Sequence, residues 1–296
     1  MASSRRFFVT PYLFLLPGLL FFAVFLIYPL VEAFRISLYD WKIMPGAVSP
    51  FVGLANYARA FHDDTFRIAL RNTVLYTAVT VPAQMVLAMF VAILLDALPR
   101  GRVIYRTLYY IPVITSWVVV SLLFRYLFDS SEAGLVNYFL MRILRVMAEP
   151  IPWMQDAGPA LVVIMILGIW KGIGWSMIIF VAALQAIPIE LHEAASIDGA
   201  NAWQRFLRIT LPLMRPTVVF VLVMLVIGGF NIFLSIYLIT GGGPLHRTES
   251  VLTYMYNEAF NFLEFGYASA ISYILAIIIF VISFLQIKFL RNPVEV

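Results

Sequence analysis

The chain has 296 residues, of which 62% are hydrophobic and only 12% are charged. Soluble domains carry about 25% charged residues, so too few polar side chains remain here to cover a water-facing surface. The net charge of +4 comes without any lysine- or arginine-rich tract, and the chain contains no cysteine. We therefore expect no nucleic-acid partner, no disulfide and no thiolate metal site. The three histidines lie far apart in the sequence, so no other metal site is expected.

Long apolar runs predict an all-α integral membrane protein. A helix needs about 20 apolar residues to cross the hydrocarbon of a bilayer, whereas a β-barrel would show alternation over strands of about 10 residues. We expect about six transmembrane helices within one domain that covers residues 1–296. They are expected at residues 11–35, 72–97, 107–128, 159–183, 212–238 and 266–288. The first run is longer than the roughly 7–15 apolar residues of a signal peptide, so we interpret it as a retained helix.

Positive charges in short connections predict the side of the membrane that each end faces. Arg100, Arg102 and Arg106 crowd one short connection, and Arg5 and Arg6 precede the first span. Because such connections stay in the cytoplasm, both termini are expected there. Three longer connections then face outward, and they cover residues 36–71, 129–158 and 239–265. They either form small helices that meet a soluble partner or simply join the spans.

The connection at residues 188–212 differs from the others in its pattern. Pro188 suits a first helical turn, where its missing N–H costs nothing. Glu190 and Glu193 lie near the positive end of that helix. Asp198-Gly199 is a strong turn signal. We therefore predict two short helices that are joined at Asp198-Gly199.

The second of these helices begins at a predicted cap. Asn201 can cap the helix, and Gln204 can complete a capping box with it. Arg205 and Arg208 point away from the face that carries apolar and aromatic side chains at helical spacing. That face consists of Trp203, Phe206, Leu207, Thr210 and Leu211. Such an element either transmits a displacement from a soluble partner to the transmembrane helices or lies as an amphipathic linker on the lipid headgroups.

Three stretches of the sequence resemble a known family. The connection at residues 188–212 is similar to the signature loop of the permease subunits of binding-protein-dependent ABC importers. This likeness rests on Glu193-Ala194-Ala195, Asp198-Gly199-Ala200, Phe206, Ile209, Leu211-Pro212 and Pro216. Residues 51–57 with Asn72-Thr73, and residues 236–244, resemble segments of the carbohydrate-importer permeases related to the maltose system. The resemblance covers roughly residues 10–290.

The resemblance implies an ABC importer type I permease fold with a cytoplasmic coupling-helix loop. In such permeases the short helix of the loop docks into a cleft on an ATPase subunit. Glu193 would then be the electrostatic anchor and Gly199 the hinge. The residues implied in ATPase coupling are Glu190, Glu193, Ala194, Ala195, Asp198, Gly199, Ala200 and Arg205. Those implied in packing the loop against its own spans are Trp203, Phe206, Leu211 and Pro212.

The resemblance also implies the surroundings of the chain. These are a bacterial inner membrane, a cytoplasmic ABC ATPase dimer, a second homologous permease subunit and an extracytoplasmic solute-binding protein. The chain itself has no phosphate-cradling Gly-x-x-x-x-Gly-Lys-Ser/Thr loop. ATP and Mg are therefore expected in the partner ATPase, and no cofactor is expected in this chain.

Polar residues inside the predicted spans are candidates for a solute path, because such residues are costly in a membrane. Lys171 could face a pore or pair with a backbone carbonyl. Gln84 and Asn231 could each serve the path or form a hydrogen bond between helices. Phe233, Tyr237 and Ser272 complete the set of candidates. An amide beside aromatic faces, as at Asn231, suits the hydroxyls of a sugar.

The resulting hypothesis is a permease subunit of an ATP-driven importer, which moves a sugar or sugar-like solute by alternating access. An enzyme is not expected, because facing spans show no triad, paired carboxylates or metal set. The alternative is a secondary transporter driven by an ion gradient. Such carriers usually show internal repeats and intramembrane carboxylates, and neither is clear in this sequence. The identity of the solute, and whether the second permease is identical, stay open.

Overall fold

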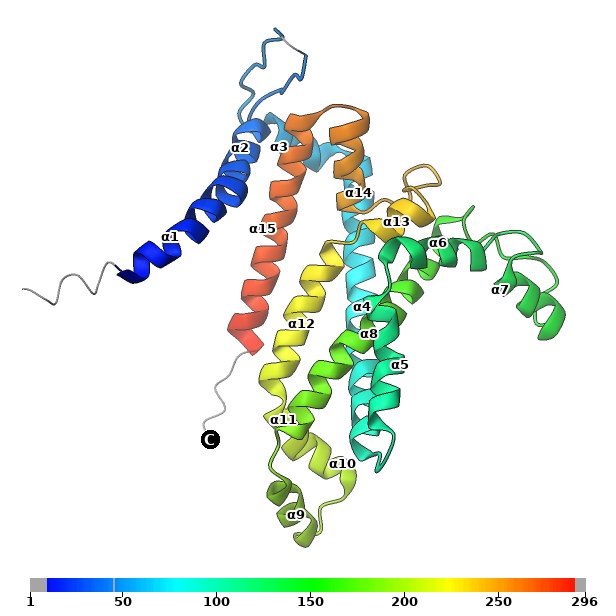
Figure 1. The fold of residues 1–296 in the computed structure, drawn as a ribbon. Helices are drawn as coiled ribbons and strands as arrows, with labels where there is room; N and C mark the ends of the chain where they lie inside the picture. Colours follow the sequence, from blue (N-terminus) through cyan, green and yellow to red (C-terminus); the bar gives the residue numbers. More distant parts are fainter. Residues whose placement is uncertain (1–9, 45, 291–296) are drawn as a thin grey trace, which may run out of the picture. The chain divides into compact units, whose positions relative to one another are not determined.

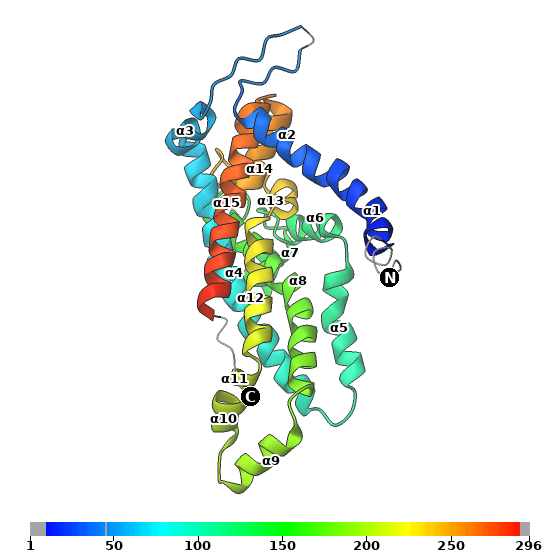
Figure 2. The ribbon, with the colours of Figure 1, turned by 90° about the vertical axis from the view of Figure 1, so that its left-hand side faces the viewer.

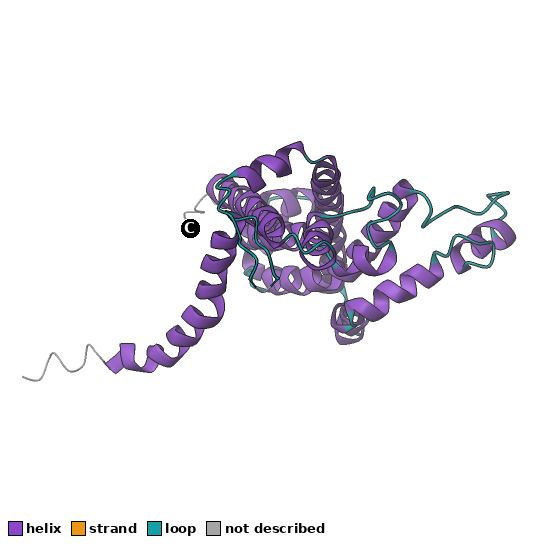
Figure 3. Ribbon diagram, turned by 90° about the horizontal axis from the view of Figure 1, so that it is seen from above, coloured by secondary structure: helices purple, strands orange, loops and turns teal. Residues whose placement is uncertain are grey.

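A computed structural model describes residues 10–44 and 46–290, and these residues are almost entirely helical (Figures 1 and 3). One isolated bridge, between Tyr39 and Phe51, is the only extended pairing within those residues. Five helices are long and apolar enough to cross a membrane, and a bent pair makes a sixth crossing if it is counted as one span. The predicted all-α membrane fold with about six spans is confirmed. Arg5 and Arg6, which entered the orientation argument, lie outside the described residues.

The chain divides into two compact units. The described part of the first covers residues 10–63 and 255–274, and that of the second covers residues 64–254 and 275–290. The helices of the first unit are α1 (Thr10–Phe22), a π-helical turn (Ala23–Ile27), α2 (Tyr28–Ser37), α3 (Ala55–His62) and a π-helical turn (Asn257–Asn261). Helix α15 (Phe265–Leu290) contributes residues to both units.

Asn56 holds the first unit together. Its amide nitrogen donates to the carbonyl oxygen of Ser37, the last residue of α2, at 2.9 Å and to that of Tyr39, just beyond the helix, at 3.0 Å. A Cβ at Gly266 would strike the Tyr39 carbonyl, so only glycine allows the start of α15 to approach this closely. Arg59 adds an ion pair with Glu264 at 3.3 Å. The motif at residues 51–57 therefore has a structural role within this unit.

The second unit contains most of the helices. They are α4 (Asp64–Ala97), α5 (Arg102–Ile114), α6 (Trp117–Leu127), α7 (Leu135–Tyr138), a π-helical turn (Phe139–Ile143), α8 (Ala157–Gln185), α9 (Ile189–Ile197), α10 (Ala202–Arg205), a π-helical turn (Phe206–Thr210), α11 (Leu211–Leu213), α12 (Arg215–Phe230), α13 (Leu234–Ile239) and α14 (Val251–Tyr256), whose last two residues belong to the first unit. Helix α8 packs along both α4 and α5, and α12 packs along α4. These four helices form the wall of the unit.

Helix α4 is longer than the sequence predicted. It starts at Asp64 rather than at residue 72, because hydropathy detects only the apolar part of a helix that extends beyond the bilayer. Its 34 residues span about 50 Å at 1.5 Å per residue, against about 30 Å of hydrocarbon. Thr73, Thr77 and Thr80 are buried on it, and each hydroxyl donates to the carbonyl four residues earlier. Their polar groups are thus satisfied without water.

Glycines let α8 approach its neighbours. A Cβ at Gly168 would meet the Tyr76 hydroxyl of α4, and one at Gly172 would meet the Gln84 side chain. A Cβ at Gly174 would meet the carbonyl oxygen of Tyr109 in α5. Small residues at four-residue spacing are the usual means by which membrane helices pack closely.

Two predicted spans are broken. The span predicted at residues 107–128 is bent, since α5 and α6 meet at 91°. Pro112 lies in the last turn of α5, and the Ser116 side chain caps α6 by accepting from the N–H of Val118 at 3.3 Å. The span predicted at residues 212–238 is interrupted between α12 and α13. There the Asn231 amide donates to the carbonyl of Ile227 at 2.8 Å.

Replacing Gly174 by alanine tests the close packing of α5 on α8. The new methyl group must displace the Tyr109 carbonyl, and overpacking of this kind costs about 1–3 kcal/mol. We expect a lower thermal denaturation midpoint for the purified subunit in detergent. Gly158→Ala is the matched control in the same helix, because a Cβ at Gly158 meets nothing within 4 Å. Equal midpoints for the two variants would contradict the packing described here.

Candidate functional site

A cavity of about 680 Å³ lies in the second unit, between the helices that form its wall. Residues of α4, α8 and α12 line it, together with residues at the bend between α5 and α6 and at the break between α12 and α13. The polar side chains are Thr80, Gln84, Lys171, Asn231 and Ser235, and the aromatic ones are Tyr76, Trp117, Trp175 and Phe233. Aromatic faces beside amides and hydroxyls form a surface suited to a solute that carries many hydroxyl groups.

Lys171 lies on the cavity wall and also closes the bend of the broken span. Its Nζ donates to the carbonyl oxygens of Pro112 and Thr115, both at 2.6 Å, and lies 4.9 Å from the centre of the Trp117 ring. The last carbonyls of a helix have no partners within that helix, so α5 needs donors at this end. The sequence left open whether Lys171 faces a pore or pairs with a backbone carbonyl. In the structure it pairs with backbone carbonyls and also lines the cavity.

The other predicted path residues divide into two groups. Gln84, Asn231 and Phe233 line the same cavity as Lys171. Tyr237 stacks on Phe233, with ring centroids 5.3 Å apart, but is not among the lining residues. Ser272 belongs to the first unit, where its hydroxyl donates to the carbonyl of Ser269 at 2.7 Å. Ser272 is therefore not a residue of this cavity.

Sequence reasoning missed several residues that shape the cavity. Tyr76, Trp117 and Trp175 supply aromatic surface to the cavity, and Gly228 of α12 also lines it. Inside apolar spans, the sequence does not distinguish aromatic residues that face lipid from those that face protein or a cavity. The signal that could have found this region is Gly168 with Gly172, whose spacing marks the close packing of α8.

The predicted helical pair in the connection at residues 188–212 is confirmed. Helix α9 ends at Ile197, and Gly199 has a positive φ of 79°, a conformation that favours glycine. Asn201 and Gln204 form the predicted capping box, with both bonds at 2.9 Å. Pro188 differs slightly from the prediction, since it is the N-cap residue of α9 rather than part of its first turn.

The residues implied in coupling lie largely on the surface of this loop. Glu190, Glu193, Ala194, Asp198 and Gly199 are exposed, and Ala195, Ala200 and Arg205 are half-buried. Arg205 braces the loop internally, because its guanidinium donates to the Ser196 hydroxyl at 2.6 Å and so joins α10 to α9. Helix α9 has no buried residue in the described chain. Most of its surface is thus available to a partner.

The packing implied for Trp203 is corrected by the structure. Trp203 is 66% exposed and stacks on Phe206, with ring centroids 5.7 Å apart, instead of packing against the spans. A π-helical turn at Phe206–Thr210 adds a residue to the turn and so breaks the predicted face. Phe206 is half-buried and lines a second cavity of about 580 Å³ beside the end of α4. Leu211 and Pro212 are exposed.

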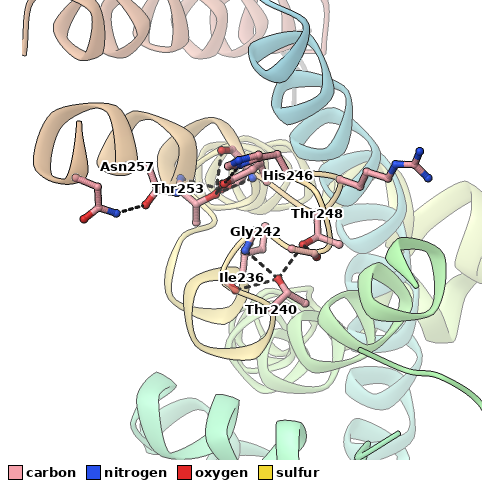
Figure 4. A network of polar contacts seen from close by, with 12 residues as sticks. Ile236, Thr240, Gly242, His246, Thr248, Thr253 and Asn257 are labelled. Carbon is pink, nitrogen blue, oxygen red and sulfur yellow. Dashed lines mark hydrogen bonds and ion pairs between the residues drawn. The ribbon is translucent and has the colours of Figure 1, made fainter. Parts of the chain in front are cut away.

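A polar cluster organises the segment between α13 and α14 (Figure 4). Glu249, which is 0% exposed, accepts from the Thr253 hydroxyl at 2.5 Å and lies 3.1 Å from His246 Nδ1. The Thr248 hydroxyl contacts that of Thr240 at 2.8 Å. The amide of Asn72 in α4 donates to the carbonyls of Arg247 and Glu249, at 2.8 and 2.9 Å. Asn72, which is among the residues that carry the resemblance to the carbohydrate-importer permeases, thereby joins α4 to this segment.

Comparison with known proteins decides the family. Residues 75–290 match the family model described as "Binding-protein-dependent transport system inner membrane component". The chain belongs to this family. It is therefore a transport permease subunit rather than an enzyme, and a multi-pass membrane protein. Among the described residues, no group of three or more His, Cys, Asp or Glu side chains could hold a metal ion.

Curated relatives match this permease over nearly its whole length. The arabinooligosaccharides transport system permease protein AraP of Bacillus subtilis is 38% identical over 94% of this chain and 87% of its own. The lactose transport system permease protein LacF of Rhizobium radiobacter is 35% identical, over 96% and 95%. The sn-glycerol-3-phosphate transport system permease protein UgpA of Yersinia enterocolitica is 34% identical, over 100% and 99%. The relatives thus include permeases of sugar importers.

Solved structures support the fold. A chain of a bacterial ABC transporter involved in the import of the acidic polysaccharide alginate superposes with a TM-score of 0.82 at 23% identity, over 97% of this chain and 96% of that one. A second structure of an alginate ABC transporter, in complex with an alginate pentasaccharide-bound periplasmic protein, gives the same score over 95% and 94%. The permease fold expected from the sequence is confirmed.

Replacing Thr253 by valine tests the polar cluster around Glu249. The change removes the hydroxyl that donates to the buried carboxylate, and a lost partner of a buried charged group costs about 2–3 kcal/mol. We expect a clear fall in the thermal midpoint of the purified permease. Thr107→Val is the isosteric control, because the exposed Thr107 hydroxyl bonds only a carbonyl of its own helix. If the two variants were equally stable, the cluster would not be the support described here.

Proposed function

We propose that this permease is one of two membrane subunits of an ATP-driven importer, and that it moves a sugar or sugar-like solute into the cytoplasm by alternating access. A cytoplasmic ATPase dimer binds ATP and Mg and drives the cycle, and this chain needs no cofactor of its own. A second homologous permease completes the path. A solute-binding protein delivers the solute from outside the membrane.

The continuity between the loop at residues 188–212 and the cavity carries this proposal. Helix α8 runs into α9, and α10 runs through α11 into α12, so the exposed loop is attached at both ends to helices that line the cavity (Figure 2). The capping box and the Arg205–Ser196 bond brace its two short helices. A braced loop of this kind transmits a displacement to α8 and α12 instead of absorbing it.

The surface of α9 suits a protein partner. Ile197 is 87% exposed at its end, next to the exposed Glu193 and Asp198. An exposed apolar side chain beside two carboxylates fits a cleft that carries a basic residue. We assign Glu193 as the anchor and Gly199, with its positive φ, as the bend that presents the helix. This docking places the loop, and with it both termini of the chain, in the cytoplasm of a bacterium.

The cavity is consistent with a hydroxylated solute. Gln84 and Asn231 line it with amides, and Trp117 and Phe233 line it with aromatic rings. The named solutes of the relatives, arabinooligosaccharides, lactose and sn-glycerol-3-phosphate, all carry two or more hydroxyls. We therefore assign the cavity as the part of the path that this chain contributes.

A charge reversal at Glu193 tests the coupling role. In Glu193→Lys the anchor would meet a basic partner with like charge, so we expect at least a tenfold loss of ATPase subunit co-purified with the permease. Glu149→Lys reverses a charge that is also exposed, in the segment between α7 and α8, and it should leave co-purification unchanged.

Retention of the ATPase by Glu193→Lys at the level of the control would contradict this assignment. Uptake that persists after ATP depletion, and stops when the ion gradient is collapsed, would instead support the secondary transporter.

A further inference from the structure

Lys171 brings an ammonium group to the wall of the cavity, and its contacts are all acceptors or a π face. Two carbonyls accept at 2.6 Å, the Val113 carbonyl lies at 3.4 Å, and the Thr115 hydroxyl lies at 3.5 Å. The Trp117 ring is 4.9 Å away. The carbonyls belong to the last turn of α5 and the residue after it, where the helix dipole is negative. Each of these features favours a cation at this position.

The positive charge of Lys171 has no carboxylate to balance it. Lys171 is the one charged side chain among the described residues that line the cavity. No ion pair within the described chain includes it. The side chain is only 4% exposed, so bulk water screens its charge weakly. Backbone carbonyls hold the ammonium in place but carry no net charge that would cancel its field.

From this geometry we infer that the path is selective for charge: it accepts neutral or anionic hydroxylated solutes and excludes cationic ones, and Lys171 determines that selectivity. The inference rests on the proposed role of the cavity as the solute path. In a cavity of this size any solute lies within about 10 Å of the ammonium. A unit charge at that distance changes the local concentration of a charged solute by about tenfold.

The absence of cysteine from the sequence makes a direct test possible. Gly228→Cys places a single thiol of this chain in the cavity, at a position where a Cβ meets nothing within 4 Å. In the assembled importer, in permeabilised membranes, this thiol is reacted with an anionic reagent (2-sulfonatoethyl methanethiosulfonate) or a cationic one (2-(trimethylammonium)ethyl methanethiosulfonate). Mass spectrometry of the peptide that contains residue 228 gives the two rates. We expect the ratio of anionic to cationic rates to fall by about tenfold in Lys171→Gln.

Further variants separate charge from structure. Glutamine at position 171 keeps donors for the α5 carbonyls but removes the charge, whereas Lys171→Arg keeps the charge and should keep the ratio. Lys171→Met, which lacks both, should show the same low ratio as Lys171→Gln where it assembles. Leu245→Cys serves as the control thiol, because Leu245 is 82% exposed in the segment between α13 and α14. Its ratio should not change with residue 171.

The outcomes distinguish two kinds of failure. An unchanged ratio at Gly228→Cys when Lys171 becomes glutamine would overturn the charge selectivity while leaving the path intact. A Gly228→Cys thiol that reacts with neither reagent would show that the cavity is closed to aqueous solutes. That result would overturn the proposed path itself.

Discussion

The hydrogen bonds from the Lys171 ammonium to the carbonyls of Pro112 and Thr115 are the interaction on which the cavity depends. Lipid offers no water to the end of a helix, so a span breaks where side chains, or water in a cavity, satisfy the freed backbone groups. Lys171 is such a side chain on α8, and the bend of 91° that it supports brings Trp117 to the cavity. Because α8 also runs into α9, one helix connects the exposed loop with the bend.

The same constraint explains the other irregular parts of the second unit. The Asn231 amide caps the end of α12, and the Ser250 hydroxyl donates to the carbonyl of Ile232 in the break that follows. The Asn72 amide holds two carbonyls of the segment before α14. In each case a side chain replaces the water that a soluble protein would use. These polar side chains therefore lie where the backbone leaves regular helix.

Much of this structure was predictable because it depends on local signals. Long apolar runs located the spans, and Asp198-Gly199 with the Asn201 cap located the two helices of the loop. The bend between α5 and α6 was not predictable from hydropathy, since Pro112 alone is tolerated inside a membrane helix. The partners of Lys171 lie on a different helix, so no pattern within α8 could reveal them. The face predicted for the second helix of the loop is interrupted by a π-helical turn, which a regular helical repeat cannot anticipate.

We propose that the loop at residues 188–212 moves helices that line the cavity. The most direct measurement is the reaction of a neutral, membrane-impermeant maleimide with the Gly228→Cys thiol from each side of the membrane, in the assembled importer with and without trapped ATP. We expect reaction from the cytoplasmic side without nucleotide and from the outer side when ATP is trapped. Reaction from the same side at the same rate in both states would show that the loop does not move these helices.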